Sequence, residues 1–183
     1  SVVFYPFVMM DVAAGAVSPD PYGAPTQAAY PWRGRVTCHP APGQPGSPDG
    51  TATAGEQVAA FFGSEEPAAD EWSYRRLVLH YARLCVEAGG VDAFLIGSEL
   101  IGLTRVRSAP GVYPAAQALA KLAADVRAIL GANCKIGYAA DWTEYGAHAL
   151  PDGELRFPLD AVFGAPQVDF VGIDAYWPLS DWR

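Results

Sequence analysis

Positively charged side chains are scarce in this sequence. Of its 183 residues, 12 are Lys or Arg and 20 are Asp or Glu, which gives a formal net charge of -8 and a pI near 4.7. The electrostatic field of such a protein does not attract the phosphate backbone of a nucleic acid or an anionic membrane surface. We therefore expect no nucleic-acid partner, and a neutral ligand fits the composition better.

Long hydrophobic runs are also missing. No stretch approaches the roughly 20 apolar residues that cross a bilayer, so we expect no membrane insertion. The N-terminal sequence SVVFYPFVMM has neither the basic region nor the cleavage site of a signal peptide.

Cysteine is rare and unpaired in the sequence. Cys38, Cys85 and Cys134 are far apart and form no CxxC pair, so neither a disulfide framework nor a zinc site is indicated. We interpret Cys85 and Cys134 as small core residues. No other set of metal ligands stands out, and we expect no metal and no cofactor.

The sequence does contain a strong strand signal at residues 91–100, VDAFLIGSEL. Its short apolar run, preceded by Gly-Gly, predicts a parallel strand that is buried on both faces. Glu99 comes directly after this run, at the strand end where α/β sheets and barrels collect their ligands. Glu99 is the first candidate for chemistry.

Three further strands are predicted, and each ends at an aspartate. Their ranges are residues 2–10, 134–140 and 168–173, followed by Asp11, Asp141 and Asp174. Helices are predicted near residues 53–62, where Thr53 and Glu56 have the spacing of a capping box, and over 70–88, 114–130 and 159–163.

Alternating strands and helices place the C-terminal ends of all strands at one edge of a parallel sheet. A doubly wound fold could do this, but a (β/α)8 TIM-barrel-like fold does so most naturally. Four strands are about half of such a barrel. We therefore expect residues 1–183 to form a single partial TIM-barrel-like domain.

Residues 11–50 are predicted to form a long loop. They contain eight of the 16 prolines and six of the 19 glycines, which exclude a long helix or a central strand. The loop also carries Tyr22, Tyr30, Trp32, Arg33 and Arg35. Such side chains are typical of a loop that covers an active site or forms a contact surface. The alternative interpretation is an irregular loop that is pinned by its own aromatic side chains.

Five long segments carry a resemblance to a known family. They are PFVMMD, the loop PDPYG...AAYPWRGRVTCHPAPGQPGSPDG, HYARLCVEAGGVDAFLIGSELIGLTRVR, KIGYAADWTEY and VDFVGIDAYWPLSDWR. In this order they resemble the TIM-barrel-like domain of gene transfer agent and phage tail-tip (host specificity) proteins. That domain is in turn similar to clan-A glycoside hydrolases.

The resemblance implies roles for the acids at the strand ends. Glu99 matches the acid/base glutamate that follows the fourth barrel strand. Burial and neighbouring carboxylates would favour its protonated form. The other three acids would follow strands three, five and six and bind substrate, together with three aromatic residues. These candidate substrate-binding residues are Asp11, Asp141, Trp142, Asp174, Tyr176 and Trp177.

Two departures from the clan-A pattern stand out. Ser98 occupies the position where many of these enzymes have Asn. The matching nucleophile would follow strand seven, which lies outside these 183 residues. A retaining glycosidase needs its two carboxyl groups about 5–5.5 Å apart, so retaining hydrolysis is expected only where the full protein supplies that strand. Asp141, Glu144 and Asp174 are the candidates within the chain for a partner of Glu99.

By this resemblance the protein would be a glycoside-hydrolase-like barrel in the hub of a phage-type tail tip or baseplate. It would act on cell-envelope polysaccharide or peptidoglycan glycan by acid/base-assisted hydrolysis. The alternative is a non-catalytic barrel that binds glycan or has a structural role. Its partners would be that glycan and other tail-tip proteins or the remainder of its own polypeptide. It would be made in the cytoplasm, assembled into the tail tip and act at the recipient cell envelope.

Overall fold

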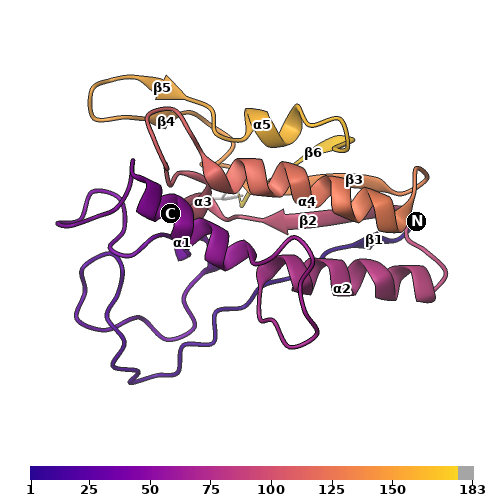
Figure 1. The fold of residues 1–183 in the computed structure, drawn as a ribbon, viewed down its shortest axis with the longest axis horizontal. Coiled ribbons are helices and arrows are strands. Elements are labelled where there is room, and N and C mark those ends of the chain that lie inside the picture. Colours follow the sequence, from indigo (N-terminus) through magenta and orange to yellow (C-terminus); the bar gives the residue numbers. More distant parts are fainter. Residues whose placement is uncertain (177–183) are drawn as a thin grey trace, which may run out of the picture.

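The computed structural model describes residues 1–176, and its centre is a four-stranded parallel sheet (Figure 1). The strands are arranged in the order β1 (Val3–Phe4), β2 (Ala93–Ser98), β3 (Lys135–Asp141) and β6 (Phe170–Asp174). Because all the pairings are parallel, the four C-terminal ends lie at one edge. This mixed α/β architecture agrees with the expected partial barrel.

Two long helices cover one face of the sheet (Figure 1). They are α2 (Tyr74–Glu87) and α4 (Pro114–Leu130), which pack against each other. The bounds of α4 are those expected from its sequence, with Pro114 in the first turn and Gly131 after the last. Helix α2 begins later than expected, because Ser73 is its N-cap and accepts a hydrogen bond from the backbone N–H of Arg76.

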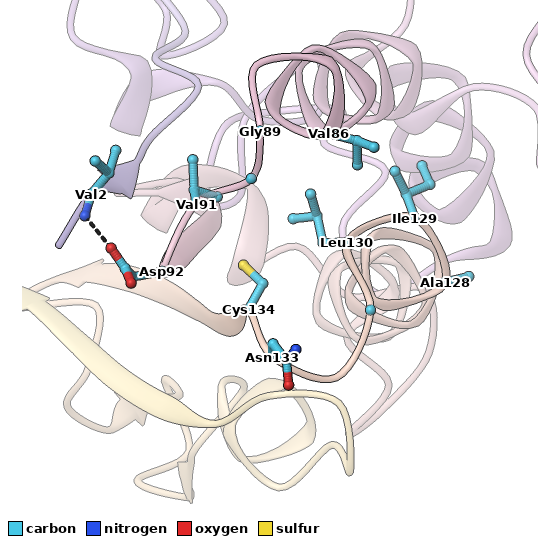
Figure 2. Close-up of a pocket in the computed structure, with 12 residues that line it drawn as sticks. Val2, Val86, Gly89, Val91, Asp92, Ala128, Ile129, Leu130, Asn133 and Cys134 are labelled. Atoms are coloured by element: carbon cyan, nitrogen blue, oxygen red, sulfur yellow. Dashed lines mark hydrogen bonds between the residues drawn. The ribbon is translucent and has the colours of Figure 1, made fainter.

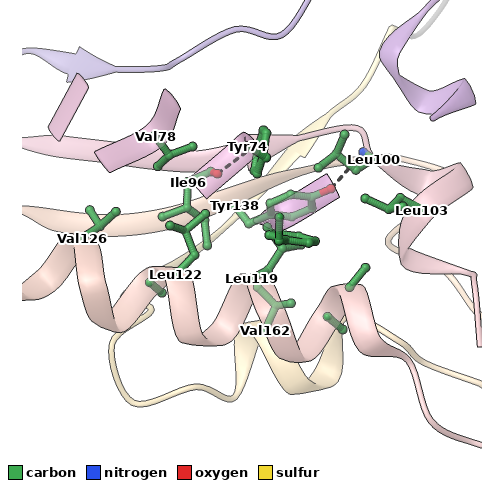
Figure 3. Close-up of a cluster of buried hydrophobic side chains, with 14 of the residues drawn as sticks. Tyr74, Val78, Ile96, Leu100, Leu103, Leu119, Leu122, Val126, Tyr138 and Val162 are labelled. Atoms are coloured by element: carbon green, nitrogen blue, oxygen red, sulfur yellow. Dashed lines mark hydrogen bonds between the residues drawn. The ribbon is translucent and has the colours of Figure 1, made fainter. Parts of the chain in front are cut away.

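The hydrophobic core lies between the sheet and these helices. Ile96 of β2 and Tyr138 of β3 point toward Leu119, Leu122 and Val126 of α4, and all five side chains are buried (Figure 3). Since side chains alternate along a strand, the residues between them face the other side of the sheet. On β3 that second face is lined by small residues and ends at Asp141.

The first strand is shorter than predicted, and this corrects the expectation for residues 2–10. Strand β1 ends at Phe4, two residues before Pro6, which has no N–H to donate to a neighbouring strand. The residue that leaves β1 at the C-terminal edge is therefore Tyr5. Asp11 lies seven residues beyond Phe4, in the loop.

Residues 11–50 form a loop whose only regular element is the short 3-10 helix η1 (Arg33–Arg35). Helix α1 (Ala52–Phe62) follows it, with Thr51 rather than Thr53 as N-cap and without the side-chain hydrogen bond of the expected capping box. The end of the loop is fixed by an ion pair of 2.5 Å between Asp49 and Arg107.

Smaller elements surround the C-terminal edge. Helix α3 (Ile101–Thr104) begins two residues after Glu99, and the hairpin of β4 (His148–Ala149) and β5 (Leu155–Arg156) follows β3. Neither was predicted, whereas α5 (Asp160–Phe163) was. Cys85 and Cys134 are buried and free, as expected.

Candidate functional site

Glu99 lies at the C-terminal end of β2 and is almost completely buried, with 3% of its surface exposed. Its backbone N–H donates to the carbonyl of Ala139 on β3 at 2.9 Å, so it continues the line of the sheet. Its φ is +50°, a left-handed conformation that few residues other than glycine adopt. A residue held in this region costs the fold roughly 1–3 kcal/mol, and such strain often marks a functional site.

Arg33 from the loop binds the carboxylate of Glu99. One of its terminal nitrogens lies 2.6 Å from Glu99 Oε2, and both side chains are less than 10% exposed. The guanidinium also donates through Nε to Ser98 Oγ at 3.0 Å, and it lies 3.9 Å from the ring centroid of Phe7. Ser98 thus helps to position Arg33.

Trp32 is the second loop residue on Glu99. Its indole Nε1–H donates to the same Oε2 atom at 2.8 Å. Both loop residues therefore bind the same oxygen of the carboxylate. The interpretation of residues 11–50 as a cover over an active site stays a prediction.

Asp141 and Asp174 are the last residues of β3 and β6, and they are direct partners in the strand register. They therefore share the face of the sheet opposite the helices, on strands about 4.8 Å apart. Burial raises the pKa of Asp174, Glu99 raises it further, Arg33 lowers it and Asp141 raises it. Three of the four predicted acids thus lie close enough to influence one another.

Tyr5 completes this group from the end of β1. Its hydroxyl lies 3.1 Å from a terminal nitrogen of Arg33, which donates to it. Burial raises the pKa of Tyr5 to about 12, against the opposing effect of Arg33, and the charges of Asp174 and Glu99 add to the rise. We call the set Tyr5, Trp32, Arg33, Glu99, Asp141 and Asp174 the carboxylate rim.

Residues 72–183 match the family model of the GTA TIM-barrel-like domain. The chain belongs to this family. A search of curated proteins finds no match to the sequence. The part that matches the GTA TIM-barrel-like domain contains Glu99, Asp141 and Asp174, whereas Trp32 and Arg33 precede it.

The other predicted site residues of this GTA TIM-barrel-like domain are placed differently. Asp11 is exposed in the loop, seven residues beyond the end of β1 rather than at the end of a strand. Trp142 and Tyr176 are 47% and 79% exposed beside Asp141 and Asp174. Trp177 lies outside the described residues.

Glu144 does not face the carboxylate rim. It is buried and accepts hydrogen bonds from Tyr138 Oη at 2.8 Å and Thr104 Oγ1 at 2.7 Å, both to Oε1. The backbone N–H of Asp141 donates to its Oε2 at 3.2 Å. Burial raises the pKa of Glu144 to about 7, against the opposing effect of these hydrogen bonds. Its contacts join α3 to the end of β3, so it supports the rim without reaching a ligand there.

Sequence reasoning did not assign roles to Tyr5, Trp32 and Arg33. Pro6 signals the early end of β1 and could have identified Tyr5 as the residue at the rim. Trp32 and Arg33 were noted as unusual loop residues, but no local pattern indicates which distant side chain a loop residue will bind.

The opposite, N-terminal end of the sheet has a cavity of its own. A cavity of about 620 Å³ opens there between the ends of α2 and α4, beside Val91 and Cys134 (Figure 2). None of the rim residues lines it. Within residues 1–176, no cluster of three or more His, Cys, Asp or Glu side chains could hold a metal ion, and no helix is long and apolar enough to cross a membrane.

Proposed function

We propose that the carboxylate rim binds a glycan of the cell envelope, either a surface polysaccharide or the glycan of peptidoglycan. The observation that carries the proposal is the buried carboxylate of Glu99, fixed on one oxygen by Arg33 and Trp32. Asp141 and Asp174 end the two neighbouring strands on the same edge. The contacts of Glu99 hold this edge in one arrangement, and Asp174, which is only partly buried, is placed there to accept hydrogen bonds from ligand hydroxyl groups.

The surroundings of the rim suit a sugar in particular. Trp32, Trp142 and Tyr176 expose much of their surface, and flat aromatic faces can pack against the C–H surfaces of sugar rings. The net charge of -8 favours a neutral ligand over an anionic one.

Hydrolysis of the glycosidic bond is the second candidate, and the raised pKa of one rim carboxyl group favours it. Burial and the neighbouring Glu99 and Asp141 raise the pKa of Asp174, against the opposing effect of Arg33. Glycosidases use one carboxyl that donates a proton to the leaving oxygen and one that is ionised. For Glu99 to be the proton donor, as the family resemblance implies, the proton would have to be carried on Oε1, because Arg33 and Trp32 both bind Oε2.

A comparison of the wild-type protein with Glu99→Gln tests both candidates. Both proteins are mixed with insoluble peptidoglycan and with envelope polysaccharide, and co-sedimentation and newly released reducing ends are measured. Binding without release supports a binding site. Release that falls about 100-fold or more in Glu99→Gln supports acid/base hydrolysis, and unchanged release removes Glu99 as the acid. If the wild-type protein shows no binding and no release, the proposal is contradicted.

We further propose that the protein works in a tail-tip or baseplate hub, in contact with other tail proteins or with the rest of its own polypeptide. It would be made in the cytoplasm and act at the envelope of the recipient cell. Membership of the GTA TIM-barrel-like domain family supports this proposal. Antibody labelling of purified particles should place the protein at the tail tip, and label elsewhere or none would contradict this role.

A further inference from the structure

We propose that Trp32 is the platform on which one sugar ring of the glycan stacks, directly beside Glu99. This inference rests on the proposed glycan binding and names the residue that determines where the sugar ring lies. It depends on how the indole is held, which face of it is free and what surrounds that face.

The indole of Trp32 is held at two places. Its N–H is directed at Glu99 Oε2. Its six-membered ring lies against Gly34, because a Cβ atom added to Gly34 would fall 2.4, 2.5 and 2.6 Å from three consecutive ring atoms, Cη2, Cζ3 and Cζ2. Three nearly equal distances place Gly34 against the face of the ring, since an approach to the edge would leave two of the atoms much farther away.

One face of the ring therefore lies against Gly34. The residue as a whole is 44% exposed. Here a large aromatic surface is kept at the surface in a fixed orientation, which lowers the entropy cost of binding a ligand to it.

The groups beside the ring match the two kinds of surface on a sugar. The exposed indole surface is apolar and suits the C–H face of a pyranose. Glu99 and Arg33 are buried at the N–H end of the ring and hold the indole in place. The partly buried Asp174 of the same rim can accept hydrogen bonds from the hydroxyl edge. The class of ligand is therefore a neutral hexose or N-acetylhexosamine chain.

The experiment compares four variants of the protein with the wild type, using soluble chitotetraose and cellotetraose as probes in isothermal titration calorimetry. Trp32→Ala removes the platform and Trp32→Phe keeps a flat ring without the N–H. Gly34→Ala keeps the indole but displaces it, since the new methyl group would overlap its face. Trp72→Ala is the matched control, because Trp72 is 94% exposed and its ring contact is with the guanidinium of Arg76, which is not a rim residue.

We expect Trp32→Ala and Gly34→Ala to weaken binding of the better probe about tenfold or more, the usual effect of removing a central aromatic contact. Trp32→Phe should stay within about threefold of wild type, and Trp72→Ala should be unchanged. Circular dichroism and thermal unfolding of each variant separate loss of binding from loss of folding.

Suppose that the wild type binds a probe and that Trp32→Ala and Trp72→Ala bind it with equal affinity. The proposal that Trp32 is the stacking platform is then wrong, whereas the proposal of glycan binding is supported. If the wild type binds neither these probes nor insoluble peptidoglycan and envelope polysaccharide, both proposals fall.

Discussion

Arg33 is the residue that connects the loop to the carboxylate rim. It contacts Tyr5, Ser98 and Glu99 with hardly any exposure to solvent. A buried ion pair contributes little relative to an apolar replacement of both partners, but removal of one partner leaves a buried charge without compensation.

We therefore expect Arg33→Met to lower the free energy of unfolding by about 3–5 kcal/mol. Arg156→Met is the matched control, because the pair of Arg156 and Glu154 is largely exposed and should contribute less than about 1 kcal/mol. Urea denaturation measures both. Adding Glu99→Gln to Arg33→Met should recover part of the loss, and an Arg33→Met variant as stable as Arg156→Met would contradict the assignment.

Glu144 should make stability depend on pH. Its pKa is raised from 4.5 to about 7 in the folded protein, so the folded state binds a proton more tightly than the unfolded state. The stabilisation is present below about pH 4.5 and is lost as the pH rises through about 7. At 1.36 kcal/mol per pKa unit the full effect is on the order of 3 kcal/mol.

Glu144→Gln should therefore flatten the fall in unfolding free energy between pH 5 and pH 8. The amide keeps an acceptor for Tyr138 and Thr104 without a charge. Glu66→Gln, at an exposed position, should retain the slope of the wild type. Equal slopes in all three proteins, measured by denaturation at several pH values, would show that Glu144 does not titrate in this range.

At the scale of elements, the packing of α2 on α4 includes a charged pair within an otherwise apolar contact. The side chain of Arg75 is 4% exposed and binds Asp125, which is 32% exposed. Burial lowers the pKa of Arg75, and its Nε has no hydrogen-bond partner in the described part of the chain. Burying Arg75 in this contact therefore costs free energy on folding, and removing one partner of the pair destabilises the fold further.

We expect Arg75→Met to destabilise the protein by about 3 kcal/mol, at the lower end for a broken buried pair because Asp125 is partly hydrated. The double variant Arg75→Met/Asp125→Leu should be more stable than Arg75→Met alone. Lys121→Met, which breaks an exposed pair of α4 with Glu65, should cost less than about 1 kcal/mol. Thermal unfolding would contradict this if the double variant were the least stable.

The elements also differ in how well the sequence predicts them. Helix α4 has a proline start, a regular apolar stripe and a glycine end, so its bounds follow from local physics. The predicted first strand is too long, because the apolar run of residues 2–10 continues past Pro6 although β1 ends at Phe4. Helix α3 and the hairpin of β4 and β5 have only short, weak patterns. Contacts of Trp32 and Arg33 with Glu99 join residues more than 60 positions apart, and only the folded chain determines them.

At the scale of the whole molecule, the described sheet has two outer strands, β1 and β6. On β6, Val171 and Ile173 are 48% and 46% exposed, and by register they lie beside Tyr138 and Ala140 on the face that α4 covers elsewhere. An outer strand with exposed apolar side chains presents both backbone groups and a hydrophobic surface to other chains.

We therefore expect a chain of residues 1–183 to self-associate through β6, with an apparent mass in light-scattering chromatography that rises with protein concentration. Ile173→Lys places a charge on this strand and should shift the protein toward the monomer. Leu155→Lys is the matched control, since Leu155 is 60% exposed on the separate hairpin, and it should associate like the wild type. A wild-type chain that stays monomeric and unfolds cooperatively at every concentration would show that the outer strands need no partner, and the open face of β6 would then be a stable surface of this barrel segment.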